Sequence, residues 1–422
     1  MNRRLRYNPS QMAGFATTTE AEQTPAAQRP RWSLAHRVIF RFTCCYWVLY
    51  ALPDTGRVSL VQAFPGAQFL IRPYINLWHA ICPWVAIHIF HLSGRPVTYF
   101  RTGSGDTTLD YMQNLLFLVF AAIACLVWTA FDRRRPDYRA LHGWLRLLVR
   151  YTLAFTLFSY GFAKVFPLQF VPTTFARLME PYGSFSPMGV LWSFMGASVP
   201  YIIFSGAAEV TGGLLLLFRR TTSLGALVSF AVLSNVVALN YFYDVPVKLY
   251  STNLLLMAVF LLVPDLGRLI DVLILNRVAA PAELLGPNFQ GRRARIAARV
   301  FCVVFVGYTL VLHLVGGWAG YKQYYGQPKP PLYGLYDVEN SNSGWRKVAI
   351  QSSQNLAIRM TDDSIQYRAT QYSGNTIALN RTDSYTWSRP DADHVLLKGD
   401  YGEIRLRKID LSKILLTNRG FH

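Results

Sequence analysis

Residues 143–166, GWLRLLVRYTLAFTLFSYGFAKVF, decide the fold because they form an apolar run long enough to cross a lipid bilayer. A membrane-spanning helix needs about 20 mainly apolar residues. The run enters with Arg146 and Arg150 and ends with Lys164, and a charge inside such a segment is costly and rare. Lys164 lies near the end of the run, where its long side chain could simply reach the membrane surface. Other polar residues must decide between anchoring and function.

Further apolar runs extend this pattern over most of the 422-residue chain, which is 52% hydrophobic. A soluble protein of this size does not need so much apolar sequence, especially in long blocks. The runs predict about seven membrane-spanning helices, at 34–52, 110–130, 145–166, 189–218, 222–243, 248–264 and 296–318. The expected fold class is therefore predominantly α, a polytopic membrane helix bundle, joined to a small C-terminal antiparallel β domain.

The basic residues give this bundle an orientation. The net charge is +19, from 42 basic and 23 acidic residues. Nucleic-acid binding is excluded as a class because no basic patch is interleaved with aromatics. Instead, short arginine clusters separate the apolar runs and fall on one side of the predicted bundle, as the positive-inside rule expects. This pattern predicts a multi-pass protein of a bacterial inner membrane, with a cytoplasmic N-terminus and a periplasmic C-terminus. Membrane lipids are then its first expected partners.

The last hundred residues change character, because apolar and polar residues alternate with period two. The alternation is clear at 355–360, 375–380, 394–399 and 403–409, and turn residues separate these segments. It predicts about six or seven short strands in an antiparallel meander, folded as a small sandwich or open barrel. The predicted domains are a disordered cytoplasmic tail (1–32), N-terminal membrane helices with an external loop (33–144), a four-helix core (145–277), a cytoplasmic loop with the last span (278–318) and an external β domain (319–422).

Three shorter segments lie outside the predicted spans. Residues 78–92, WHAICPWVAIHIFHL, are too short to cross and carry Pro83, which predicts a broken interfacial or re-entrant helix. Residues 103–108, GSGDTT, predict a turn followed by a helix whose N-cap is Asp106, Thr107 or Thr108. Residues 265–277 follow Pro264 and predict an amphipathic helix on the cytoplasmic face.

A glutamate in the fourth predicted span changes the interpretation of Lys164. In residues 205–220, SGAAEVTGGLLLLFRR, Glu209 lies ten residues before Arg219, which places it near the predicted bilayer midplane. A carboxylate there must be protonated, reach water or pair with a cation. The small residues around it permit close helix packing. We therefore expect Lys164 and Glu209 to form an ion pair inside the bundle.

Several further polar and aromatic residues fall in the outer half of the same predicted helices. They predict a pocket open to the outer side, lined by Tyr160, Asn235, Asn240, Asp244, Lys248 and Asn253. The competing interpretation is that these groups form hydrogen bonds between helices or anchor the chain at the interface. Lys164 and Lys248 are the only lysines before residue 320, which marks both positions within an arginine-rich region.

The motifs of this region resemble the DoxX family of integral membrane proteins. The resemblance is carried by Gly161 and Lys164 at the end of one helix, and by Glu209, Gly212 and Gly213 in the next, followed by leucines and Arg219. It covers about a third of the chain, residues 145–275, and implies a four-helix membrane bundle. It also implies a redox role, such as quinone-coupled thiosulfate oxidation or membership of an oxidative-stress complex. The added helices and the β domain depart from the family unit.

No common catalytic motif appears in the chain. There is no nucleotide-binding loop, zinc-protease motif, haem-attachment motif or nucleophile elbow, and the five cysteines have apolar neighbours and form no C-x-x-C. His88 and His91 are spaced to share a helix face and are weak candidates for a metal or haem, although no metal site is predicted. His142 and His313 are isolated and are expected to pack or lie at the interface.

Three functions agree with these observations. The first is a redox-linked membrane subunit with quinone as its cofactor and Lys164 and Glu209 as a proton relay. The second is a carrier for a small solute or proton that uses the outer pocket. The third is a non-enzymatic anchor that presents the β domain to a periplasmic protein partner. The sequence leaves open whether the chain is an enzyme.

Overall fold

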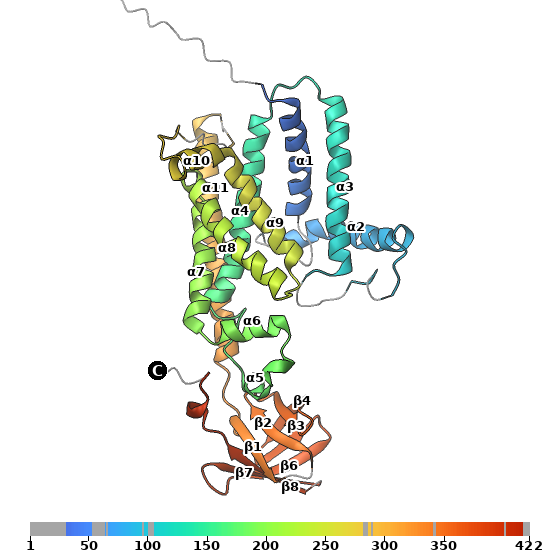
Figure 1. Cartoon of the computed structure of the whole chain (residues 1–422), viewed down its shortest axis with the longest axis vertical. Helices are drawn as coiled ribbons and strands as arrows, with labels where there is room; N and C mark the ends of the chain where they lie inside the picture. Colours follow the sequence, from blue (N-terminus) through green and yellow to red (C-terminus); the bar gives the residue numbers. More distant parts are fainter. Residues whose placement is uncertain are drawn as a thin grey trace, which may run out of the picture.

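Long helices form one part of the molecule and a β-barrel forms the other, as the computed structural model shows (Figure 1). The structure describes residues 31–52, 64, 66–94, 97–99, 105–281, 286–287, 290–340, 343–400 and 402–416. The predicted cytoplasmic tail lies, apart from its last two residues, outside the described part. The prediction of a mainly helical chain with a C-terminal antiparallel β domain is confirmed.

The helices follow the predicted apolar runs closely. Their bounds are α1 Leu34–Ala51, α2 Ala67–His88, α3 Thr108–Phe131, α4 Arg139–Val165, α5 Phe175–Met179, α6 Pro187–Gly196, α7 Val199–Leu216, α8 Thr222–Phe242, α9 Lys248–Leu262, α10 Leu266–Leu273 and α11 Arg292–Tyr325. The start of α3 is the predicted one, because Thr107 caps it and forms a reciprocal capping box with Asp110.

Four of these helices pack as a closed unit in the order α4, α7, α8, α9 and back to α4. The contact between α4 and α7 is the most extensive between any two elements. Apolar side chains fill the centre of the unit, among them Leu153, Phe158, Leu216, Met257 and Leu261. Helices α1 and α3 pack on each other and α1 also contacts α4, while α11 lies along another side of α4.

Within the described residues, four helical segments are long and apolar enough to cross a membrane. They are Thr108–Phe131, Val199–Leu216, Arg219–Phe242 and Arg292–Tyr325. The predicted spans at 145–166 and 248–264 do not meet this measure, because α9 has only 15 residues and α4 carries several charges. Seven crossings therefore remain a prediction, whereas four helices of membrane-spanning character are present.

Two predictions about proline were wrong. The predicted span at 189–218 is two helices, α6 and α7, because Ser198 caps a new helix and Pro200 follows at its start, where its missing N–H costs nothing. Conversely, Pro83 does not break the segment at 78–92. Helix α2 runs without interruption through Pro73 and Pro83 and ends at His88. The predicted amphipathic helix at 265–277 is real but shorter, as α10.

The β domain is a closed barrel of eight strands, where six or seven strands in a sandwich or open barrel were expected. The strands are β1 Gly334–Asn340, β2 Trp345–Ile350, β3 Asn355–Met360, β4 Ile365–Ser373, β5 Thr376–Leu379, β6 Asp383–Ser388, β7 His394–Gly399 and β8 Gly402–Lys408. Each strand pairs antiparallel with the next, and β1 pairs with β8 to close the ring. Closure removes the exposed edges that an open sheet would leave.

The barrel is joined to the bundle by a linker and also by the packing of helix α5 against it. Phe175 and Met179 of the short helix α5 are buried against Leu335, Ala349 and Ala357 of the barrel. The backbone N–H of Phe175 also donates a hydrogen bond to Gln351 Oε1 (2.9 Å). Helices α5 and α6, which connect α4 to α7, therefore lie between the bundle and the barrel (Figure 1).

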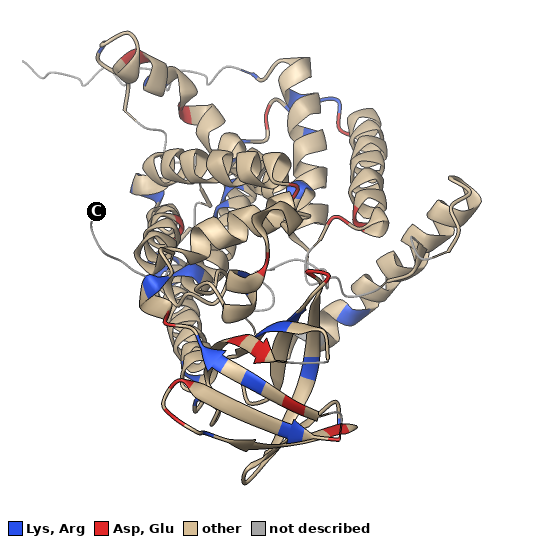
Figure 2. Ribbon diagram, turned by 60° about the horizontal axis from the view of Figure 1, so that its bottom comes forward, with Lys and Arg blue, Asp and Glu red and all other residues tan. Residues whose placement is uncertain are grey.

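The two ends of the bundle differ in charge. The connection between α3 and α4 and helix α10 lie at the end opposite the barrel (Figure 1), and this end holds Arg133, Arg134, Arg135 and Arg268. Figure 2 shows helices that are mostly uncharged along their length and a barrel with basic and acidic residues side by side. Helix α2 runs across the direction of α1 and α3, as an interfacial helix would (Figure 1).

Candidate functional site

The structure brings Lys164 and Glu209 together in the interior of the bundle. Lys164 Nζ donates hydrogen bonds to both carboxylate oxygens of Glu209, each at 2.8 Å. The two side chains are only 8% and 5% exposed. The lysine gives each carboxylate oxygen one hydrogen bond and keeps a third N–H donor, so the two buried charges are paired with each other.

Glycines one turn before each charged residue make this contact geometrically feasible. A Cβ on Gly161 would lie 2.9 Å from the carbonyl oxygen of Gly206, and a Cβ on Gly206 would lie 2.5 Å from the carbonyl oxygen of Gly161. The backbones of α4 and α7 therefore touch at this level. A second contact of the same kind occurs at Gly213, which packs against Phe158. Small residues at both helices let the Lys164 and Glu209 side chains meet.

Tyrosine residues extend the polar character of the pair toward α9. The ring of Tyr160 lies 5.8 Å from Lys164 Nζ, a distance suited to a cation–π contact. Its ring centroid is 6.1 Å from that of Tyr250 on α9, and the Tyr250 hydroxyl lies 3.2 Å from Thr156 Oγ1. Aromatic rings and one hydroxyl pair therefore connect the ion pair on α4 with α9.

The other predicted pocket residues do not join this pair in one site. Asn253 accepts a hydrogen bond from Tyr46 (2.6 Å) and donates to the carbonyl oxygen of Leu249 (2.9 Å), so it connects α1 to α9. Asn240 is buried, and its Nδ2 has no hydrogen-bond partner among the described residues. Asn235 is exposed on the surface of α8. The sequence-based prediction placed these residues at a similar depth along the helices, but their side chains point in different directions around each helix.

Asp244 and Lys248 form a separate ion pair at the turn between α8 and α9. Lys248 donates to Asp244, whose side chain is 78% exposed. The same turn is fixed by Asp106, which accepts hydrogen bonds from the backbone N–H groups of Lys248 (2.6 Å) and Leu249 (3.0 Å). Asp106 thus caps α9 from a distant part of the chain. These contacts assign the turn a structural role.

The weak metal candidates also separate. His88 lies at the end of α2, where its Nδ1 is 2.9 Å from the carbonyl oxygen of Trp84 and its ring stacks on Trp84. His91 lies beyond the helix with a positive φ of 53°, so the two histidines do not share a helix face. Across the described ranges, no three His, Cys, Asp or Glu residues gather as metal ligands would.

Sequence reasoning missed a histidine that contacts the quoted run. His313 of α11 lies with Nε2 2.8 Å from Ser159 Oγ and with Nδ1 2.7 Å from the carbonyl oxygen of Thr309. A carbonyl can only accept, so Nδ1 carries the proton and Nε2 accepts from the serine hydroxyl. Phe155 packs edge-on against the imidazole and Phe162 stacks on it. No spacing in the sequence connects Ser159 with a residue 154 positions later.

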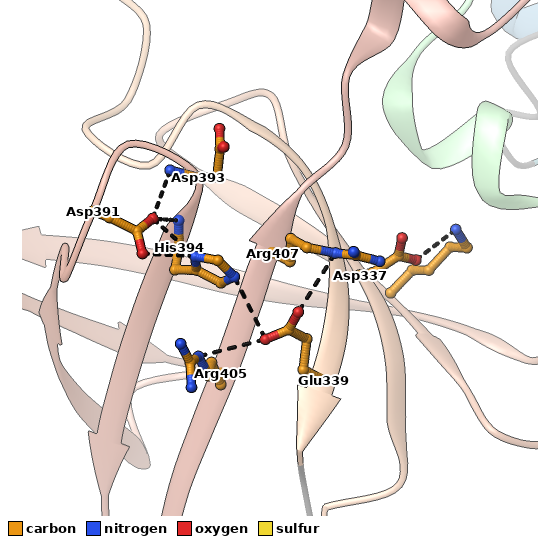
Figure 3. Close-up of polar contacts among 8 residues, drawn as sticks. Asp337, Glu339, Asp391, Asp393, His394, Arg405 and Arg407 are labelled. Carbon is orange, nitrogen blue, oxygen red and sulfur yellow. Dashed lines mark hydrogen bonds and ion pairs between the residues drawn. The ribbon is translucent and has the colours of Figure 1, made fainter.

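The barrel carries a second cluster of titratable groups, drawn in Figure 3. His394 lies between two carboxylates, with Nδ1 2.8 Å from Asp391 and Nε2 3.6 Å from Glu339. Glu339 in turn lies 3.4 Å from Arg405 and 3.5 Å from Arg407. The cluster joins β1, β7 and β8, the strands that close the barrel.

This cluster predicts a pH dependence of barrel stability. The hydrogen bond from His394 lowers the pKa of Asp391 below its ordinary value of 3.8. A carboxyl group whose pKa is lower in the folded state stabilises the fold above its unfolded pKa, and this contribution disappears as pH falls through the folded pKa. We expect the protection of amides in β7 and β8 against hydrogen exchange, measured relative to the intrinsic exchange rate at each pH, to fall below about pH 4, and Asp391→Asn to weaken this dependence. An identical pH profile for the variant would contradict the assignment.

Comparison with known proteins shows a similarity to a curated protein of Bacillus subtilis. The chain is 37% identical over 116 residues to the uncharacterized protein YwoB of Bacillus subtilis (strain 168), a match that covers 28% of this chain and 73% of YwoB. No family model matches the sequence. No solved structure matches it either.

Proposed function

This chain belongs to the same protein family as YwoB of Bacillus subtilis, and we propose that it is a DoxX-like integral membrane protein that acts as a redox-linked, quinone-associated subunit. The observation that carries the proposal is the buried Lys164–Glu209 pair between α4 and α7. In this proposal the pair moves protons for the redox reaction. The name of the relative assigns no activity, so the support comes from the residues of this chain.

The chemistry of the pair supports proton transfer. A lysine and a glutamate in contact can exist as an ion pair or, after one proton moves from Nζ to the carboxylate, as two neutral groups. The interior of the bundle has a low dielectric constant, which reduces the free-energy difference between these two states. Ionisable groups inside membrane segments commonly mark proton relays for this reason. Tyr160 and the Thr156–Tyr250 contact would continue the path.

The packing of the four-helix unit supports the resemblance to the DoxX family. The residues that carry the resemblance, Gly161, Lys164, Glu209, Gly212 and Gly213, all lie on α4 or α7. They are buried. A quinone has an apolar body and polar carbonyl ends, and the aromatic rings beside Lys164 suit such a molecule. The quinone would accept a hydrogen bond from Lys164 Nζ.

The arrangement of the ends supports a bacterial inner-membrane location. Arginines gather at the end of the bundle opposite the barrel, which corresponds to a cytoplasmic N-terminus and a periplasmic C-terminus under the positive-inside rule. The four helices of membrane-spanning character provide the anchor.

One observation favours a second function, the presentation of the barrel to a periplasmic protein. Helix α5 docks on the barrel through Phe175 and Met179, so the barrel is held by the bundle. A fixed orientation is useful for a protein that displays a binding surface. By contrast, the dispersed positions of Asn235, Asn253 and Asp244 give no support to the carrier function.

Quinone content separates these functions. We expect the full chain, purified in mild detergent from a bacterial membrane, to carry quinone that organic extraction and chromatography detect. Lys164→Met should lower this content about tenfold, because it removes the ammonium that would donate to the quinone, and the loss of a charged hydrogen bond costs about 1.5 kcal/mol. Asp244→Asn, which alters only the exposed pair, should leave it unchanged. Wild-type protein without quinone would contradict the redox proposal and leave barrel presentation as the better function.

A further inference from the structure

A cavity of about 430 Å³ lies between α1 and α3 at the arginine-rich end of the bundle. It is formed by Leu34, Arg37, Arg41, Leu126, Thr129, Ala130 and Arg133. Three of these seven residues are arginines and none is acidic. The cavity is far from the Lys164–Glu209 pair, which lies toward the barrel end of α4. It therefore belongs to no site described above.

The three arginines differ in how their hydrogen-bonding groups are used. Arg41 is buried and makes four hydrogen bonds, since it donates to Tyr138 (3.0 and 2.8 Å), to Thr129 (2.9 Å) and to the carbonyl oxygen of Asp132 (2.5 Å). It holds α1 against the end of α3. Four of its five N–H donors are used within the protein, so this arginine mainly builds the wall of the cavity.

Arg37 and Arg133 have donors to spare. Arg37 Nη1 donates to the carbonyl oxygens of Arg133 (3.1 Å) and Arg135 (2.9 Å), but its Nε is buried and has no partner among the described residues. Arg133 is exposed, and its Nε donates to the carbonyl oxygen of Ala130 (3.1 Å). A buried guanidinium N–H without an acceptor is costly, and a bound anion would remove that cost.

The shape and the surroundings of the cavity identify the class of anion. Its apolar residues Leu34 and Leu126 are 62% and 70% exposed, so an apolar rim borders the charged part. The first turn of α1, capped by Ser33, adds its partial positive charge at the same place. A ligand that fits must combine an anionic head with apolar chains. We propose that this cavity binds the phosphate head group of an anionic phospholipid.

This inference rests on the proposed membrane location but not on the proposed redox activity. In that location, the arginine-rich end lies at the depth of the cytoplasmic lipid head groups, where anionic lipids attract basic side chains. The exposed leucines would then face the acyl chains. The phosphate would lie between Arg37 and Arg133 and receive hydrogen bonds from both guanidinium groups, a geometry for which arginine is well suited.

Lipid binding to the purified full chain tests the proposal. We expect native mass spectrometry to detect retained phosphatidylglycerol, and far less phosphatidylcholine with the same acyl chains. Replacing Arg37 and Arg133 together by Gln should weaken phosphatidylglycerol binding about 30-fold, since each surface arginine contributes about 1 kcal/mol to the attraction. Arg134→Gln is the matched control, because Arg134 lies in the same loop but does not line the cavity.

A second variant protects the test against misfolding. Ala130→Trp keeps every charge and fills the cavity, so it should also lower phosphatidylglycerol binding while the protein stays folded. Phosphatidylglycerol binding that neither variant changes, or equal binding of the two lipids, would overturn the proposal. Displacement of the lipid by inorganic phosphate at equal concentration would assign the cavity to free anions and overturn the lipid assignment. Quinone content plays no part in any of these outcomes.

Discussion

Replacing Lys164 by Met is expected to lower the free energy of unfolding by about 3–5 kcal/mol. The variant removes the ammonium that donates to both oxygens of Glu209 and leaves a carboxylate that is 5% exposed. An unpaired charge in such a place must become protonated or draw in water, and both responses destabilise the native packing. Denaturant titration of the full chain in detergent, followed by circular dichroism, measures the loss.

Replacing both partners separates the stability that the ion pair contributes from the cost of burying one unpaired charge. In the double variant Lys164→Met, Glu209→Leu no charge is buried, so most of the lost stability should return. The matched control is Lys248→Met, since Lys248 pairs with an Asp244 side chain that is 78% exposed. That control should leave the free energy of unfolding nearly unchanged, because exposed ion pairs contribute little. If the single and double variants lose equal and small amounts of stability, Lys164 only anchors the helix at the membrane surface.

Replacing Gly206 by Ala is expected to have the next largest effect, a loss of about 2–3 kcal/mol. The added Cβ would lie 2.5 Å from the carbonyl oxygen of Gly161, 2.7 Å from Lys164 Cβ and 2.9 Å from the backbone N of Val165. None of these atoms belongs to the free end of a flexible side chain, so α4 and α7 must separate. Separation also lengthens the hydrogen bonds between Lys164 and Glu209.

A glycine on another helix provides the control for this prediction. A Cβ on Gly307, within α11, would meet no atom within 4 Å. Gly307→Ala should therefore leave stability unchanged or raise it slightly, because alanine favours a helix by about 1 kcal/mol over glycine. The same denaturant titration compares the two variants. Similar effects at both positions would show that helix propensity, and not the contact between α4 and α7, determines the result.

The sequence allowed the helices to be located but not the directions that their side chains face. Hydropathy placed α1, α3, α8 and α9 within about two residues at each end, because bilayer-length apolar runs are a strong signal. Helices α4 and α11 extend beyond their predicted spans, α4 at its start and α11 at both ends. Height along a helix placed Lys164 near Glu209, and adjacent glycines indicated close packing. The same reasoning grouped Asn235 with Asn253, although the first is exposed on α8 and the second is buried against α1. Rotation about each helix axis depends on tertiary packing.

Other features depended on contacts between distant residues. Ser159 and His313 meet only because α11 packs along α4, and no local pattern indicates this pairing. Barrel closure depends on β1 and β8, whose alternation of apolar and polar residues would suit an open sheet equally well. The break between α6 and α7 carried a local signal, Ser198 followed by Pro200, but the surrounding apolar residues outweighed it.

The pairing of the first and last strands determines when the barrel can be completed during synthesis. Strand β1 begins at Gly334, a few residues after α11 ends at Tyr325, and must wait for β8, which ends at Lys408. Until then β1 and β7 expose unpaired backbone groups that invite association with other chains. The nascent barrel therefore depends on β8 reaching the same side of the bundle as α5. A chain truncated before β8 keeps its helices but exposes the unpaired edges of β1 and β7.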